Sequence, residues 1–158
     1  MKIGFKKVHP DAMLPKYAHD GDAGMDVCAV EDVELKPGKA TLVSTGLIAD
    51  IPTGYSIQVY SRSGLALKKN ITVWNGPGLC DSKYRGVIGV VLMYIPSLDR
   101  IEVRGKEVKA PSYHIQKGDK IAQLVLVPVT RCQPVEVNDI NTNTDRGDKG
   151  FGSSGLRG

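Results

Sequence analysis

Hydrophobic and polar residues alternate along most of the chain, and glycine or proline interrupts the alternation every few residues. A period of two predicts half-buried β-strands, and the frequent turn residues predict that these strands are short. The segments predicted as strands are residues 2–8, 22–29, 33–35, 40–43, 45–51, 55–60, 71–75, 87–94, 121–129 and 135–137. The pattern is typical of an all-β sandwich or barrel, and it does not select between the two.

Residues 61–69 break this alternation. Ser63 can cap a short helix that carries Leu65, Ala66 and Leu67, and Arg62 stands just before it. A helix start beside an arginine and hydroxyl groups is a candidate anion site, and a simple capped turn is the alternative. We therefore predict one short helix in a β protein.

Two segments stand outside the predicted core. Residues 96–111 are charged and hold two short alternating arms about a turn. This pattern predicts a surface hairpin, which is either neutral decoration or a contact for a partner protein. After Asn138 hydrophobic residues nearly vanish, and such a segment cannot bury enough surface to stay ordered alone. We expect a β domain over residues 1–140 and a mobile, glycine-rich arm over residues 141–158.

Composition narrows the class of protein. With 158 residues, 41% of them hydrophobic, the chain suits one globular domain. The net charge of +4 is mild and comes without a polybasic stripe, so we expect no nucleic-acid partner. No segment has the apolar length of a membrane span or a secretion signal, so we expect no membrane contact. The three cysteines are far apart and form no CxxC motif, which indicates reduced thiols in a cytoplasmic protein.

The candidate chemistry centres on residues 76–86, where glycine and proline precede a predicted buried strand. We predict a hairpin here, with residues 71–75 as its first arm and with Asp81 and Tyr84 at its mouth. A carboxylate held in this way can take a proton from water, and an aromatic ring nearby can stack on a ligand.

Other parts of the chain carry groups suited to phosphates, namely Arg62, Ser63, Gly64, Gln123 and the tail with Arg146. A second carboxylate, Asp26, and a second aromatic ring, Phe151, complete the set. Together they offer donors for phosphates, rings for a base and a sugar, and acids for a metal and a water. This combination favours a nucleoside polyphosphate as the ligand.

Five stretches in this order and spacing resemble the five motifs of the trimeric dUTP pyrophosphatase (dUTPase) family. They are residues 23–26, 62–66, 75–86, 118–124 and 146–155, which read AGMD, RSGLA, NGPGLCDSKYRG, GDKIAQL and RGDKGFGSSG. Each motif alone is weak, but all five in order across nearly the whole chain are a strong signal. The resemblance implies a jelly-roll-like β fold and a homotrimer with three shared active sites. It also implies Mg²⁺-dependent hydrolysis of dUTP to dUMP and diphosphate, which keeps uracil out of DNA and supplies dUMP for thymidylate synthesis.

The resemblance further implies a role for each motif residue. Asp81 would orient and deprotonate the attacking water, and Tyr84 would pack on the deoxyribose and leave no room for a 2′-hydroxyl. Asp26 would act on Mg²⁺ through its waters, because Mg²⁺ keeps several waters and binds substrate phosphates. The remaining substrate-binding residues would be Asn75 and Gly78 at the uracil edge, Phe151 and Gly152 over the base, and Arg62, Ser63, Gly64, Gln123, Arg146, Ser153 and Ser154 on the phosphates.

The sequence departs from the family pattern at four positions. Cys80 stands where the family usually has isoleucine, Val87 replaces a common acidic residue and Tyr94 replaces a common asparagine. Lys149 replaces a glycine of the tail motif, which restricts the backbone but adds a charge suited to phosphates.

Two rival functions share this fold. A dCTP deaminase carries a glutamate on the strand after the Asp81-type motif, and residues 87–94 contain no acidic residue. A non-catalytic nucleotide-binding regulator would be expected to have lost either Asp81 or the tail, and this chain has both.

Overall fold

The structure is a computed structural model that describes residues 1–97, 102–104 and 107–150. Its described part is built from short strands, with one seven-residue helix, α1 (Ser63–Lys69). The strands are β1 (Gly4–Lys7), β2 (Met25–Cys28), β3 (Val33–Leu35), β4 (Thr41–Ser44), β5 (Leu47–Asp50), β6 (Tyr55–Tyr60), β7 (Ile71–Val73), β8 (Gly78–Asp81), β9 (Gly89–Tyr94), β10 (Glu102–Arg104), β11 (Glu107–Lys109), β12 (Tyr113–Ile115) and β13 (Lys120–Pro128).

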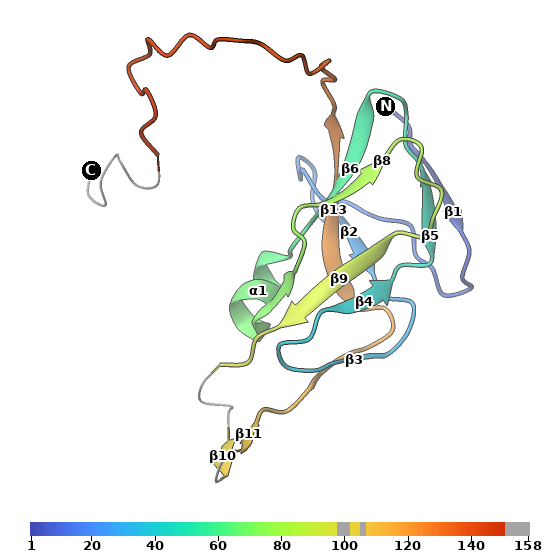
Figure 1. Ribbon diagram of the computed structural model, residues 1–158. Coiled ribbons are helices and arrows are strands. Elements are labelled where there is room, and N and C mark those ends of the chain that lie inside the picture. The colour runs from blue at the N-terminus through green and yellow to red at the C-terminus, as the bar shows by residue number, and fades with distance from the viewer. Residues whose placement is uncertain (98–101, 105–106, 151–158) are drawn as a thin grey trace.

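Two sheets supply most of the hydrophobic core. One has the strand order β2-β13-β6-β8 and the other has the order β4-β9-β7, and all their pairs are antiparallel (Figure 1). Alternate side chains of each sheet point inward, so Ile57 and Val59 of β6 are buried together with Val90 and Leu92 of β9. Burial of an aliphatic side chain of this size contributes about 1.5–3 kcal/mol to the stability of the fold. The inward-facing side chains of the alternating strands therefore hold the two sheets together.

The opposite face of the four-stranded sheet lies away from this core. Strand register places the residues of this face in three rows, which run Asp26, Gln123 and Tyr60, then Val125, Gln58 and Leu79, then Val127, Ser56 and Asp81. We call these nine residues the outer face. Leu79, in the middle row, is 63% exposed. The middle row of the outer face therefore presents Val125 and exposed Leu79 on either side of Gln58, and the two carboxylates stand at opposite ends of the face.

The all-β class with one short helix is confirmed in the described part of the chain. Two strands were not predicted, β8 and β12. The strand predicted at residues 135–137 is wrong, because this segment makes no ladder with any described strand. Ser63 is not the helix cap either; Arg62 holds the N-cap position, and its side chain makes no capping hydrogen bond.

The hairpin predicted around residues 76–86 is confirmed, because its two arms pair as the antiparallel strands β7 and β9, but the segment between them holds β8, a strand that was not predicted. β7 pairs with β9, whereas β8 pairs with β6 in the other sheet. The chain between β7 and β8 therefore crosses from one sheet to the other. The physical reason is burial, because Ile71 and Val73 complete the three-stranded sheet's core face while Gly78 lies against Val59 of β6.

The two outlying segments differ in character. β10 and β11 pair with each other as a separate antiparallel hairpin, as predicted for residues 96–111. Residues 131–149 are exposed along their whole length, and Figure 1 shows them leaving the body of the protein. Phe151, Gly152, Ser153 and Ser154 lie outside the described residues.

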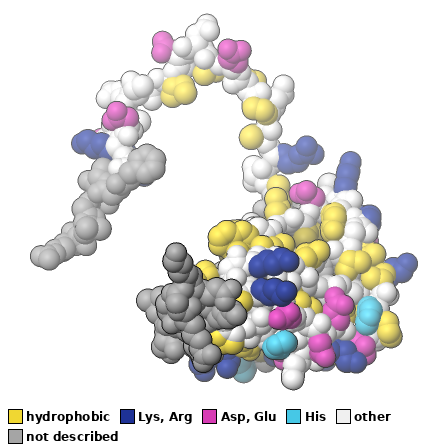
Figure 2. Space-filling view, turned by 60° about the horizontal axis from the view of Figure 1, so that its bottom comes forward, with side chains coloured by type: hydrophobic (Ala, Val, Ile, Leu, Met, Phe, Trp, Pro, Cys, Tyr) yellow, Lys and Arg dark blue, Asp and Glu magenta, His cyan; other side chains and the backbone are white. Residues whose placement is uncertain are grey.

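The surface mixes charges of both signs. On the face drawn in Figure 2, Lys and Arg side chains stand among acidic and hydrophobic ones. No helix in the described ranges is long and apolar enough to cross a membrane.

Candidate active site

Asp26 is the centre of a cluster of charged and polar side chains at one end of the outer face. Its side chain is only 6% exposed, and both of its carboxylate oxygens are occupied. Arg62 Nε donates to Oδ1 at 3.1 Å, and Lys120 Nζ lies 2.8 Å from Oδ2. Gln123 Nε2 also donates to Oδ1, at 3.4 Å. Three residues assigned to phosphates or metal by sequence, Asp26, Arg62 and Gln123, are thus in direct contact.

The charge of Asp26 depends on its two cationic neighbours. Burial alone raises the pKa of a carboxyl group, but the hydrogen bond from Lys120 and the charge of Arg62 outweigh it and hold the pKa of Asp26 below its usual value. Asp26 is therefore an ionised carboxylate in a largely enclosed position.

Local backbone features position this cluster. The register of β13 against β2 shifts between Lys120 and Ala122, and the carbonyl of Lys120 accepts a hydrogen bond from Arg62 Nη1 at 3.2 Å. On β2 the preceding Gly24 lies under Gln123, because a Cβ built on Gly24 would come 3.0 Å from Gln123 Cβ. A larger residue at position 24 would therefore displace the glutamine.

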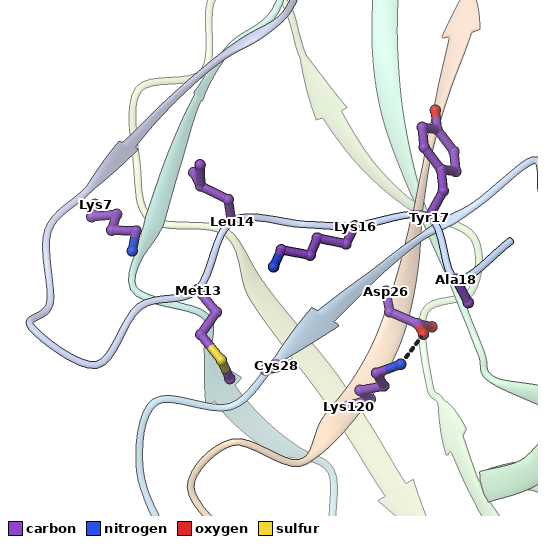
Figure 3. Close-up of a pocket in the computed structure, with 9 residues that line it drawn as sticks. All are labelled: Lys7, Met13, Leu14, Lys16, Tyr17, Ala18, Asp26, Cys28 and Lys120. Carbon is purple, nitrogen blue, oxygen red and sulfur yellow. Dashed lines mark ion pairs between the residues drawn. The ribbon is translucent and has the colours of Figure 1, made fainter. Parts of the chain in front are cut away.

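The cluster lies between two cavities. A cavity of about 460 Å³ has Asp26 and Lys120 on one side, and Figure 3 shows the side chains of Met13, Leu14 and Lys7 across from them. A second cavity of about 350 Å³ is lined by Arg62, Asp119 and Lys120, among others. Lys120 borders both cavities. The two spaces have room for phosphate groups and for hydrated ions next to the cationic side chains.

Arg62, Ser63 and Gly64 follow one another at the start of α1. Just before them, Ser61 Oγ accepts a hydrogen bond from Val73 N at 2.8 Å and lies 2.9 Å from the hydroxyl of Thr72. These contacts tie the entry of the helix to β7. The structure thus brings Arg62 into the Asp26 cluster and leaves Ser63 and Gly64 exposed beside it.

Asp81 ends β8, at the other end of the outer face. Its side chain is exposed, and its carbonyl accepts a hydrogen bond from Tyr84 N at 3.0 Å. The Tyr84 hydroxyl donates to the carbonyl of Val87 at 3.2 Å, which fixes the ring next to the turn. Asp81 and Tyr84 therefore lie close together, as predicted.

Asn75 lies above the start of the same strand. A Cβ built on Gly78 would stand 3.3 Å from Val59 Cβ and 3.4 Å from Asn75 Nδ2. Because Gly78 has no side chain, it can pack closely against both Val59 of β6 and the Asn75 amide. This places Asn75 and Gly78 together, about three residues, or roughly 10 Å, from Asp81 along β8.

The two groups of residues are far apart within one chain. Asp26 shares a row with Tyr60, whereas Asp81 shares a row with Ser56, and β2 and β8 are the first and last strands of the sheet. Three strand spacings across and four residues along the strands correspond to about 20 Å. A base at Asp81 cannot act on a phosphate held by Arg62 of the same chain over that distance.

The residues that suit a metal are few. Within the described ranges no group of three or more His, Cys, Asp or Glu side chains lies together as metal ligands would. Asp26 is a single ionised carboxylate beside a cavity, and both of its oxygens already hold cationic side chains. With its oxygens paired in this way, Asp26 offers no free oxygen for direct metal coordination, so a Mg²⁺ at this site would have to take its ligands from phosphates and water.

In the described part of the chain, the tail residues contact neither the Asp26 cluster nor the residues around Asp81. Arg146 Nε donates to the carbonyl of Lys149 at 3.0 Å, so its guanidinium is held within a local turn. Phe151, Gly152, Ser153 and Ser154 are outside the described residues.

Sequence reasoning missed two residues. Lys120 contacts both Asp26 and Arg62, and its place in the GDKIAQL stretch was the available signal. Arg85 supports the turn after Asp81, where its Nη1 donates to the carbonyls of Ser82 and Tyr84 at 2.8 and 2.9 Å. Its position in the Tyr84-Arg85-Gly86 stretch was the corresponding signal.

Comparisons with known proteins agree on one family. Residues 11–155 match the family model described as dUTPase. The deoxyuridine 5′-triphosphate nucleotidohydrolase of Hydrogenobaculum sp. (strain Y04AAS1) is 45% identical over 158 residues, which cover 99% of this chain and 100% of that protein.

Solved structures show the same similarity. The dUTPase of Staphylococcus bacteriophage 80alpha with dUpNHpp superposes with a TM-score of 0.84 at 30% identity, covering 98% of this chain and 99% of that one. A dUTPase variant from phage phi11 of S. aureus, described with a structural Mg(II) ion, gives a TM-score of 0.76 at 26% identity, covering 88% and 98%. The jelly-roll-like β fold expected from the sequence motifs is that of these neighbours.

Proposed function

Since this chain belongs to the dUTPase family and is a dUTP diphosphatase, we propose that its active site is divided between chains. In this proposal Asp81 of one subunit acts on the nucleotide phosphates that Arg62 and Gln123 of another subunit hold. The observation that carries it is the separation of about 20 Å between the Asp81 end and the Asp26 end of the outer face.

A homotrimer is the assembly that we propose. Closed cyclic symmetry lets the Asp81 end of each chain meet the Asp26 end of the next, and all sites are then equivalent. The exposed leucine of the outer face supports an interface there, because Leu79 is 63% exposed on the single chain. Burying it against a neighbouring subunit would be favourable.

The proposed chemistry is attack of water on a phosphoryl group, with Asp81 as the general base. Phosphoryl transfer needs positioning and charge stabilisation more than covalent help. The Asp81 carboxylate is exposed at the end of a strand, so it can accept a proton from a water that approaches the phosphate. The turn that Arg85 supports keeps Tyr84 next to it.

Asn75, Gly78 and Tyr84 form the proposed nucleoside pocket. The amide of Asn75 and the backbone at Gly78 offer donors and acceptors to the polar edge of uracil. Cytosine presents the opposite pattern there, so it would leave buried groups unpaired and be rejected. Tyr84 would pack on the deoxyribose and exclude a 2′-hydroxyl.

Mg²⁺ is the proposed cofactor. When bound, it would neutralise charge on the phosphates, and Asp26 would act on it through water, because both carboxylate oxygens already contact cationic side chains. Arg62, Ser63, Gly64 and Gln123 would bind the phosphate oxygens directly.

We further propose that residues 141–158 form an arm beyond a β domain of residues 1–140. Phe151 and Gly152 would cover the base, and Arg146, Ser153 and Ser154 would meet the phosphates. The exposure of residues 131–149 is consistent with an arm that contacts another subunit. The three free cysteines suit a reducing compartment, and we propose the cytoplasm.

A substrate panel tests this function. The protein is incubated with dUTP, dCTP, dTTP and UTP, each with Mg²⁺ and with EDTA, and diphosphate and ammonia are measured. We expect diphosphate from dUTP with Mg²⁺ and little from the other nucleotides. Ammonia released from dCTP would instead indicate a deaminase, which the acid-free sequence of β9 disfavours.

A further inference from the structure

Lys120 touches both partners of the phosphate cluster through different atoms. Its Nζ lies 2.8 Å from Asp26 Oδ2, and its carbonyl oxygen accepts a hydrogen bond from Arg62 Nη1 at 3.2 Å. Within the described ranges, Gln123 contacts Asp26 alone of these two partners, so it does not make this double contact. The register shift in β13 falls at Lys120, where the regular ladder with β2 is interrupted.

The contacts of Arg62 leave part of its guanidinium available. Nε is bound to Asp26 and Nη1 to the Lys120 carbonyl, whereas Nη2 donates to no described residue. The side chain is 30% exposed. A guanidinium fixed on one edge presents its other edge in a defined direction, which is the geometry that binds phosphate oxygens in a bidentate manner.

The net charge of the cluster also depends on Lys120. Arg62 and Lys120 carry positive charges and Asp26 a negative one, so the three side chains together are positive. Without the ammonium of Lys120, the charges of Arg62 and Asp26 would cancel. The buried carboxylate would then have Arg62 as its single cationic partner and would compete with phosphate for the guanidinium.

We propose that Lys120 is a positioning residue that serves as the counter-ion of Asp26 and thereby keeps Arg62 available to the phosphate chain of the nucleotide. This inference rests on the proposed function, because it assumes that Arg62 binds phosphates. Lys120 acts through Arg62 and Asp26, so its effect grows with the number of phosphates on the ligand. A residue needed only for folding would affect all ligands in the same proportion.

The test measures binding, without turnover. Dissociation constants of the intact protein are measured by calorimetry for deoxyuridine, dUMP, dUDP and dUpNHpp, each with Mg²⁺ and with EDTA. For Lys120→Met we expect the dissociation constant of dUpNHpp to rise about tenfold or more, that of dUMP to rise less, and that of deoxyuridine to stay unchanged. The difference should persist in EDTA, because Arg62, which Lys120 keeps available, is proposed to contact the phosphates and not the metal.

Two variants provide the controls. Lys120→Arg keeps a cation that can pair with Asp26 and should restore most of the dUpNHpp affinity. Lys117→Met removes an exposed ion pair with Asp11, 3.2 Å long in the same turn region, and should leave every dissociation constant unchanged. If Lys120→Met does not fold, Lys120→Gln is measured with the same expectations.

The outcomes distinguish a failure of the role proposed for Lys120 from a failure of the proposed function. Equal affinity of the parent protein and Lys120→Met for dUpNHpp would overturn the role of Lys120 while leaving the proposed function intact. The same would follow if the loss were equal for deoxyuridine and dUpNHpp. A parent protein that binds dUpNHpp no better than deoxyuridine would contradict the proposed function and this inference together.

Discussion

Mixing two inactive variants tests whether the active site is shared between chains. Asp81→Asn removes the proposed base, and Arg62→Ala removes the proposed phosphate ligand at the other end of the outer face. Each homo-oligomer lacks one essential group in every site. Because Asp81 lies about 20 Å from Asp26, which Arg62 contacts, a mixed oligomer can hold both intact groups where two different chains meet.

The expected recovery follows from random assembly. In an equal mixture, half of the chains carry an intact Arg62 and half carry an intact Asp81. A site between two neighbouring chains has both groups in about one quarter of cases, so the mixture should regain about one quarter of the parent activity. Asp81→Asn alone should retain roughly 1% or less, since a positioned base contributes about 10²–10⁴. The activity of Arg62→Ala alone should fall by about 10²–10³, the usual loss when one donor to developing charge is removed.

The assay compares the two variants refolded together with the same variants assembled separately and then combined. Diphosphate release from dUTP is measured in both samples, and native mass spectrometry, which resolves the mass difference between the two variants, shows which oligomers are mixed. Activity should appear in the sample that was refolded together. Activity no higher than the mean of the two variants, in oligomers shown to be mixed, would mean that each chain uses its own Asp81 and Arg62 and that the shared site is wrong.

Three further predictions concern the tail, the tyrosine and the thiols. Removing the chain from Asn143 onward should abolish most turnover. The melting temperature of the nucleotide-free protein should stay within about 1–2 °C of the parent value, because the described tail residues are exposed. A truncated protein that hydrolyses dUTP at the parent rate would show that the tail has no role in turnover. Tyr84→Ala should raise hydrolysis of UTP relative to dUTP, whereas Tyr84→Phe, which loses only the hydroxyl bond to the carbonyl of Val87, should keep the parent preference; identical preferences in both variants would argue against a sugar contact. Thiol reagents should label exposed Cys132 before Cys80, because burial and the charge of Asp81 raise the pKa of the Cys80 thiol; mass spectrometry that finds Cys80 labelled first would contradict its burial.

The strands that the sequence identified well are those with one fully buried face. β6 and β13 show strong alternation or a long apolar run, and the core needs both of them. β8 was missed because it begins with glycine and carries the exposed Leu79, so its pattern is that of a turn. The opposite error occurred at residues 135–137, where alternating valines are present but no described strand pairs with them.

Local motifs predicted two groups of residues that the structure places together. Asp81 and Tyr84 are close because only two residues of the chain separate them. Asp26, Arg62 and Gln123 were assigned to one ligand, and the structure brings them into contact. The distance from this cluster to Asp81 depends on the order of four strands and on their register, which no local pattern contains. The role of Lys120 likewise depends on a register shift in β13 that the sequence does not reveal.

The most direct test of the central claim is the turnover of Asp81→Asn. The exchange keeps the shape of an exposed side chain, so the variant should fold, assemble and bind dUpNHpp like the parent protein. With the proton acceptor removed, hydrolysis of dUTP under saturating Mg²⁺ should fall by roughly 10²–10⁴. An Asp81→Asn protein that hydrolyses dUTP at the parent rate would contradict the assignment of Asp81 as the base.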